Sequence, residues 1–127
     1  LVNSDSPTLP TAFLTSAARR LLDNPAQVVL GPAEDGGYFL IGMSVPHAGL
    51  FADIAWSSPA VAAQTRARAA ALGLPLVEFG PWYDVDDPAS LDRLAAETRR
   101  PEPGCPRRYP APATSEFLRR LGMTGSR

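Results

Sequence analysis

No lysine occurs in this chain of 127 residues: all twelve cationic residues are arginine. A phosphate-binding lysine and a Schiff-base lysine are therefore excluded within it. The single cysteine, Cys105, has no partner for an internal disulfide and cannot build a cysteine-based zinc site. The single histidine, His47, follows a proline in a predicted loop, which disfavours Ser-His-Asp and Cys-His mechanisms. Chemistry by this chain has to come from carboxylates.

Long hydrophobic runs are also missing, since none approaches the roughly 20 residues needed to span a bilayer. The first residues do not resemble a signal peptide. We therefore expect a cytoplasmic protein without a membrane partner. With 45% hydrophobic and 20% charged residues, the composition is typical of one soluble globular domain that buries a core.

The spacing of apolar residues predicts strands that alternate with helices. Strands are expected at residues 27–30, 38–43 and 75–79, and helices at about 8–22, 58–72, from 87 onward and at 115–121. This alternation indicates an α/β layered fold with a largely parallel sheet. In such sheets ligands gather beyond the carboxyl ends of the strands.

Composition divides the chain into three parts. Residues 1–96 are expected to form the folded domain, 97–114 a linker rich in proline and arginine, and 115–127 a short tail helix. Five prolines favour a solvated linker over a nucleic-acid-binding surface. Because Leu1 and Val2 resemble the end of a strand, we expect the N-terminal strands to be missing and the chain to be a fragment. Its composition does not indicate an oligomeric state.

The most informative segment is an acidic loop that runs directly into an apolar strand. From Gly31 it reads Gly-Pro-Ala-Glu-Asp-Gly-Gly-Tyr-Phe-Leu-Ile-Gly. Gly36 and Gly37 would allow backbone and carboxylate to approach a polar ligand closely, because glycine lacks a Cβ and tolerates positive φ. Glu34 and Asp35 are the candidate catalytic residues, since either could bind a sugar hydroxyl or act as a base.

Two further acidic turns each lie where a predicted strand passes into a predicted helix: Asn3-Ser4-Asp5-Ser6-Pro7 and Tyr83-Asp84-Val85-Asp86-Asp87-Pro88. Taken alone, Asp5 or Asp87 is also explained as the cap of the following helix. Taken together, the turns offer the hard oxygen donors that magnesium and manganese prefer. Gathered acids repel one another unless a cation lies among them. We therefore predict a divalent metal ion, Mg²⁺ or Mn²⁺, held by Asp5, Asp84 and Asp86.

Aromatic residues accompany these turns. Phe39 is expected in the core. Tyr38, Trp56 and Trp82 are candidate substrate-binding residues, together with the two loop glycines, because aromatic rings stack on sugars or bases. The alternative for each ring is a position in the core.

Four segments resemble, in the same order, the DUF2064 family: residues 3–10, 31–38, 51–57 and 82–86. These are glycosyltransferase-like proteins of the GT-A superfamily, the nucleotide-diphospho-sugar transferases. The similarity covers about residues 1–95, and the Glu-Asp-Gly-Gly-Tyr block is its most specific part. Two departures stand out: Asn3 occupies the first position of the Asp-x-Asp glycosyltransferase motif, and the N-terminal half with the nucleotide loop is absent.

The resemblance implies a Rossmann-like GT-A fold in which a divalent ion bridges the protein and a nucleotide diphosphate. Asp5 matches the metal-binding aspartate after the central strand. Asp84 and Asp86 match a late acidic motif that supplies a second metal contact in related nucleotidyltransferases. Residues 35–37 match the loop on the acceptor or sugar side.

Three functions are compatible with these features. The leading hypothesis is a metal-dependent transferase that uses a nucleotide-diphospho-sugar donor and a small-molecule acceptor. The second is a nucleotidyltransferase that consumes a nucleoside triphosphate and releases pyrophosphate. The third is an inactive fragment or a non-catalytic binding module. The same fold and acids serve the first two, so the sequence leaves the choice open.

Overall fold

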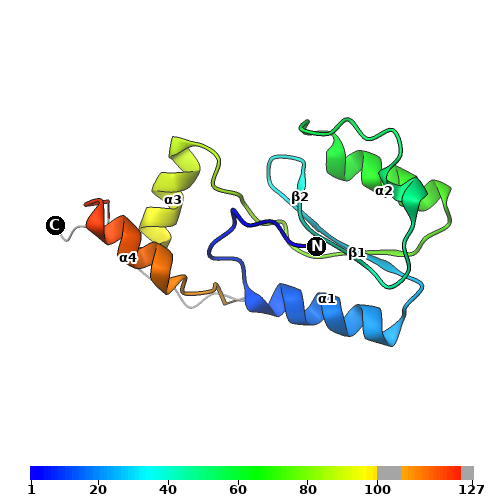
Figure 1. Cartoon of the computed structure of the whole chain (residues 1–127), viewed down its shortest axis with the longest axis horizontal. Helices are drawn as coiled ribbons and strands as arrows, with labels where there is room; N and C mark the ends of the chain where they lie inside the picture. The colour runs from blue at the N-terminus through cyan, green and yellow to red at the C-terminus, as the bar shows by residue number, and fades with distance from the viewer. Residues whose placement is uncertain (100–106, 124–127) are drawn as a thin grey trace.

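The computed structural model describes residues 1–99 and 107–123 (Figure 1). In chain order its elements are α1 (Thr11–Asp23), β1 (Val28–Pro32), β2 (Tyr38–Met43), the 3-10 helix η1 (Ala48–Phe51), α2 (Val61–Ala71), β3 (Leu76–Glu78), α3 (Pro88–Arg99) and α4 (Pro112–Arg120). The three predicted strands are confirmed, and each predicted helix is found with shifted ends. None of the helices in the described ranges is long and apolar enough to cross a membrane.

The sheet is mixed, so the prediction of a largely parallel sheet is wrong. Its order is β2-β1-β3, with β1 antiparallel to β2 and parallel to β3. The reason is the length of the connections. The acidic loop between β1 and β2 is too short for a crossover and returns the chain antiparallel, whereas η1 and α2 provide the crossover to β3. Leu1 and Val2 lie along β2, where Val2 forms an antiparallel bridge with Leu40.

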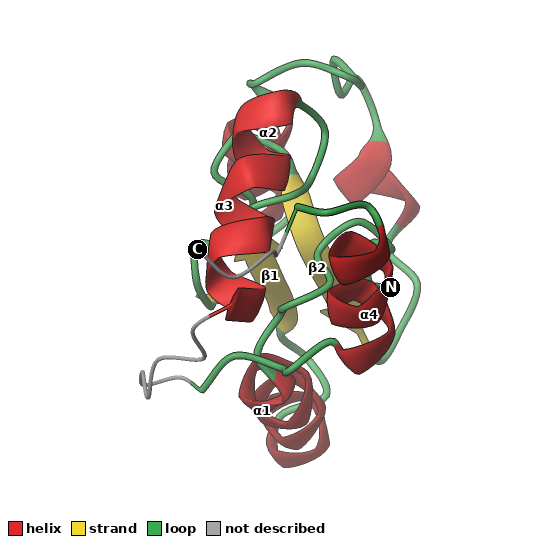
Figure 2. Ribbon diagram, turned by 90° about the vertical axis from the view of Figure 1, so that its left-hand side faces the viewer, coloured by secondary structure: helices red, strands yellow, loops and turns green. Residues whose placement is uncertain are grey.

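Helices cover both faces of this sheet, with α1 on one side and α2 on the other (Figures 1 and 2). Successive residues of β1 point to opposite sides. Val29 therefore packs on the α1 side, in a cluster with Leu9, Ala17, Phe39 and Leu40. Val28 and Leu30 pack on the α2 side, in a cluster with Ile41, Leu50 and Ala69. Phe39 is a core residue, as predicted, with 1% of its surface exposed.

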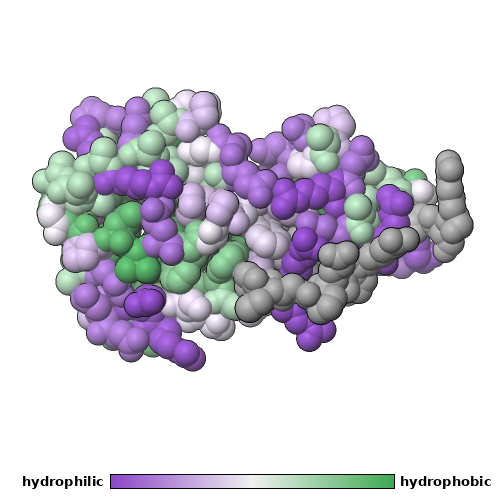
Figure 3. All heavy atoms as spheres, turned by 180° about the vertical axis from the view of Figure 1, so that it is seen from behind, coloured by the Kyte–Doolittle hydropathy of each residue, from purple (hydrophilic) through white to green (hydrophobic). Residues whose placement is uncertain are grey.

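Helices α3 and α4 form a separate small cluster at one end of the molecule (Figure 1). Leu94 and Ala95 of α3 face Leu118 of α4 there. Helix α3 continues three residues past the predicted linker boundary, and α4 begins at Pro112, because proline is tolerated in the first turn of a helix. The predicted linker residues 100–106, which include Cys105, and the tail residues 124–127 lie outside the described residues. Seen from behind, hydrophobic side chains gather at the opposite end, away from α3 and α4 (Figure 3).

The close packing of β1 on Phe39 yields a stability prediction. A Cβ added at Gly31 would lie 2.4 Å from Cζ of the buried Phe39 ring. We expect Gly31→Ala to lower the free energy of unfolding by about 1–3 kcal/mol, the usual cost of overpacking, as measured by urea denaturation. Adding Phe39→Leu should make the combined loss smaller than the sum of the two single losses. A Gly31→Ala variant with the native urea midpoint would contradict this packing.

Candidate functional site

The backbone brings the three acidic turns together at one edge of the sheet. Beyond the ends of β1 and β3, Ala33 and Trp82 form a parallel bridge, and the Glu34 N–H donates to the Trp82 carbonyl at 2.9 Å. The Val85 N–H donates to the Asp5 carbonyl, also at 2.9 Å. The acidic loop and the segment 84–86 therefore lie side by side at the carboxyl ends of two parallel strands, where α/β sheets bind ligands.

Three carboxylates converge at this edge. One oxygen from each of Asp35, Asp84 and Asp86 lies within 4.8 Å of the others. Oxygens on opposite sides of a magnesium ion are about 4.2 Å apart, twice the usual Mg–O distance of about 2.1 Å, so small side-chain rotations would bring this group to the spacing of a shared cation. The sequence predicted Asp84 and Asp86 for this role but placed Asp35 in catalysis. Asp5 adjoins the group through its carbonyl, and its role as a direct ligand stays a prediction.

The electrostatics of Asp84 also suit a cation. Burial is the largest cause of a pKa raised to about 6, and the charges of Asp35, Asp5, Asp86 and Glu34 add to it. In addition, Oδ1 of Asp84 is buried and has no hydrogen-bond partner in the described chain. An unpaired buried carboxylate oxygen among other acids is costly, and a bound divalent ion would relieve that cost. The residues present therefore fit such an ion.

The glycines of the acidic loop shape the loop itself. Gly36 has a φ of +95°, and a Cβ there would lie 2.1 Å from the carbonyl oxygen of Pro59. Its own carbonyl accepts a hydrogen bond from the Ala62 N–H in the first turn of α2, at 2.8 Å. The Gly37 N–H donates to Oδ1 of Asp35 at 2.8 Å. Close approach at Gly36 is thus to α2, while Gly37 orients the Asp35 carboxylate.

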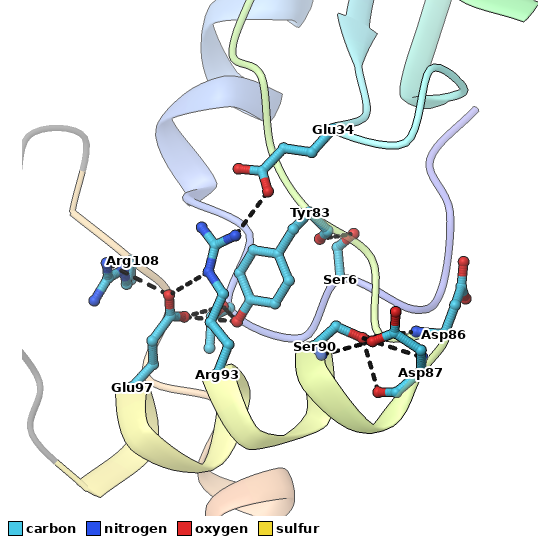
Figure 4. A network of polar contacts seen from close by, with 10 residues as sticks. Ser6, Glu34, Tyr83, Asp86, Asp87, Ser90, Arg93, Glu97 and Arg108 are labelled. Carbon is cyan, nitrogen blue, oxygen red and sulfur yellow. Dashed lines mark hydrogen bonds and ion pairs between the residues drawn. The ribbon is translucent and has the colours of Figure 1, made fainter. Parts of the chain in front are cut away.

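Glu34 points toward α3 and forms an ion pair there with Arg93, at 2.7 Å (Figure 4). The Arg93 guanidinium lies over the Tyr83 ring, 3.8 Å from its centroid, and its Nε donates to Oε1 of Glu97 at 3.4 Å. Glu34, predicted as a base or a sugar ligand, is therefore already paired with the guanidinium of Arg93. Glu34 could act as a catalytic residue only after this ion pair opens.

Glu97 is the anchor of this network, with 8% of its side chain exposed. Its Oε2 accepts hydrogen bonds from the Thr8 hydroxyl at 3.0 Å and the Tyr83 hydroxyl at 2.7 Å, and Arg108 pairs with Oε1 at 3.4 Å. Burial, with Glu97 adding to it, raises the pKa of Tyr83 to about 12, so the phenol stays a donor. Sequence reasoning missed this cluster: Thr8 was assigned to a helix start, and its partners lie 75 and 89 residues away along the chain.

Two hollows flank the aspartates. The smaller, of about 310 Å³, is lined on the α3 side by Tyr83, Asp84 and Arg93. The larger, of about 540 Å³, is lined by Tyr38 and Trp56 and by the turn that leads into α2. Asp35 and Asp86 line both hollows. A ligand in either one therefore contacts the acidic group.

The two candidate tryptophans differ in their surroundings. Trp56 is 52% exposed at the larger hollow, whereas Trp82 packs against the α1-side core, edge-on to Phe13 at 6.1 Å. The structure thus places Trp82 in the alternative core position. Trp56 and Tyr38 have positions from which a ring can face a ligand.

Comparisons with known proteins agree with this architecture. Residues 1–58 match the family model described as "Uncharacterized protein conserved in bacteria (DUF2064)", which confirms the resemblance over that stretch. The chain is also similar to the crystal structure of a "putative nucleotide-diphospho-sugar transferase" from Desulfovibrio desulfuricans G20, with 27% identity and a TM-score of 0.74. That similarity covers 95% of this chain and 51% of the other, so this chain spans about half its length. No curated protein matches. The chain thus resembles, over nearly its whole length, about half of that structure.

The raised pKa of Asp84 gives a test of the acidic group. Because the folded-state pKa of about 6 exceeds the ordinary value of 3.8, the folded chain binds the proton more tightly, and this group favours folding as the pH falls from about 6 toward 4. At pH values above 6 and without added metal, we expect Asp84→Asn to raise the midpoint temperature of thermal unfolding. This gain in midpoint temperature should vanish near pH 4. An equal difference at both pH values, measured by calorimetry, would contradict the assigned cause.

Proposed function

We propose that the protein is a metal-dependent transferase that uses a nucleotide-diphospho-sugar donor. The observation that carries this proposal is the convergence of Asp35, Asp84 and Asp86, with the buried, unpartnered Oδ1 of Asp84 among them. A Rossmann-like GT-A fold is in keeping with the similarity to the Desulfovibrio structure, of which this chain covers about half.

Asp84 and Asp86 would hold a Mg²⁺ or Mn²⁺ ion, with Asp5 and Asp35 beside them. When bound, such an ion supplies charge neutralisation for a departing diphosphate. The chain's own contribution is to fix the carboxylates in advance, because the parallel bridge of Ala33 with Trp82 sets the spacing of the loop and the segment 84–86. Preorganised charges of this kind need little rearrangement during reaction.

Asp35 is our candidate for the group that receives the acceptor's proton. Its carboxylate is oriented by the Gly37 N–H and lines both hollows, so it can face an acceptor hydroxyl on the Trp56 side. In the proposed reaction the acceptor oxygen bonds to the sugar's anomeric carbon, the bond from that carbon to the diphosphate breaks, and the hydroxyl proton passes to the carboxylate. Glu34 is the second candidate, conditional on release from Arg93.

Donor binding provides the test of this proposal. Isothermal titration calorimetry of the full-length protein with UDP-glucose and GDP-mannose should show binding only with Mg²⁺ or Mn²⁺ present. We expect Asp84→Asn to weaken that binding at least tenfold, about 1.4 kcal/mol, because it removes a ligand charge. Asp5→Ala should abolish it.

Asp23→Asn serves as the matched control, since Asp23 is an exposed aspartate at the end of α1, which leads to the start of β1 and not to the carboxyl ends of the strands. It should bind nucleotide sugars as the native chain does. Metal-independent binding, or equal losses in the Asp84 and Asp23 variants, would refute the proposal. Release of pyrophosphate from CTP or GTP with a phosphorylated acceptor would favour the nucleotidyltransferase instead.

A further inference from the structure

The larger hollow has features of a binding site that the acidic group alone does not explain. Trp56 exposes half of its surface there, beside the half-buried Tyr38. An indole ring left open to water beside a concave surface offers a flat apolar face, and rings of this kind pack against the C–H faces of sugars. The hollow's volume of about 540 Å³ lies in the range of small-molecule sites.

The turn that carries Trp56 is fixed by hydrogen bonds. The Ala55 N–H donates to Oε1 of Gln64 on α2 at 2.7 Å, and the Ser58 hydroxyl donates to the Ala55 carbonyl at 2.6 Å. The backbone N–H of Trp56 donates to the carbonyl of the buried Ile54 at 3.0 Å. The ring is therefore presented from a backbone that is held in place, and a ligand would meet it at little ordering cost.

The charge of the lining selects among ligands. Two carboxylates, Asp35 and Asp86, line this hollow, and its lining contains no arginine in the described chain. The neighbouring hollow differs, because Arg93 lines it. Hydroxyl donors are stabilised by such carboxylates, whereas a phosphate group is repelled.

We propose, on the basis of the proposed function, that the hollow between Trp56 and Asp35 is the acceptor subsite and takes a neutral polyhydroxylated compound. The Trp56 ring packs against its carbon face, Asp35 and Asp86 accept hydrogen bonds from its hydroxyl groups, and Ser57 and Ser58 also line the hollow. Because Asp35 and Asp86 also belong to the cation group, an acceptor hydroxyl in this hollow lies next to the place assigned to the departing diphosphate. The subsite is expected to bind phosphorylated acceptors more weakly than neutral ones, because Asp35 and Asp86 repel a phosphate group.

Ligand-observed saturation-transfer NMR on the whole chain, without metal or nucleotide, tests this subsite. The probes are glucose, N-acetylglucosamine and glucose 6-phosphate. We expect saturable signals from the neutral sugars and at least tenfold weaker binding of the phosphate ester. Trp56→Ala should weaken the neutral sugars at least tenfold, and Trp56→Phe should retain most of the affinity. Phe117→Ala, which removes a 62% exposed ring from α4, is the matched control and should bind normally.

A second variant isolates the charge effect. Asp35→Asn keeps an oxygen for the Gly37 N–H but removes one negative charge, so the preference for glucose over its phosphate should narrow several-fold. Asp23→Asn should leave the preference unchanged. Tighter binding of glucose 6-phosphate, no saturable signal from either neutral sugar, or unaltered binding in a folded Trp56→Ala variant would overturn the proposal. Because donor and metal are absent, these results are independent of the calorimetric test of donor binding.

Discussion

The site depends on a backbone constraint: the pairing of the acidic loop with the segment after β3. Two hydrogen bonds beyond the regular strands, from Glu34 N–H to Trp82 and from Trp82 N–H to Pro32, hold Asp35 beside Asp84 and Asp86. Like charges at this spacing repel, so the chain would not gather them without a framework that resists their separation. Burial of Asp84 is the largest cause of its raised pKa, and the neighbouring carboxylates that this framework holds in place raise it further.

A second network, of side-chain hydrogen bonds and ion pairs, connects this part of the sheet with helices α3 and α4. Glu97 of α3 accepts hydrogen bonds from Thr8 and Tyr83 and forms an ion pair with Arg108. Thr8 lies in the N-terminal turn, Tyr83 follows β3, and Arg108 lies in the segment before α4. Because Glu97 is almost fully buried, its charge requires these donors, and loss of any one leaves a desolvated group less satisfied. Arg93 links the same network to Glu34, so the position of the acidic loop depends on α3 as well as on the sheet (Figure 4).

Much of the fold could be predicted from local patterns, because β-strand alternation and helical spacing are properties of short segments. Strand direction was mispredicted: a short loop with two glycines returns the chain antiparallel, which the α/β pattern alone does not specify. Asp84 and Asp86 were proposed as metal ligands because they lie in one acidic turn. Asp35 was placed in catalysis instead, since its contact with that turn depends on which strands pair. The Glu97 cluster carries no local signal, because its members are far apart in the chain.

The two tryptophans show the same division between local and tertiary information. Both flank acidic turns in the sequence, yet Trp82 packs on Phe13 while Trp56 remains exposed on a hydrogen-bonded turn. Burial of an aromatic ring is decided by the helix that covers it, here α1, and not by its neighbours in the chain. Exposure at a hollow, next to oriented carboxylates, is what separates a candidate binding ring from a core ring.

The central claim, that the three aspartates form a site for a divalent cation, is tested most directly by titrating the Asp84 carboxyl carbon by ¹³C NMR with and without Mg²⁺. The account predicts a pKa of about 6 in the absence of metal and a clear decrease when magnesium is added, since a bound cation favours the ionised carboxylate. An Asp84 pKa that does not change with saturating Mg²⁺ or Mn²⁺ would contradict it.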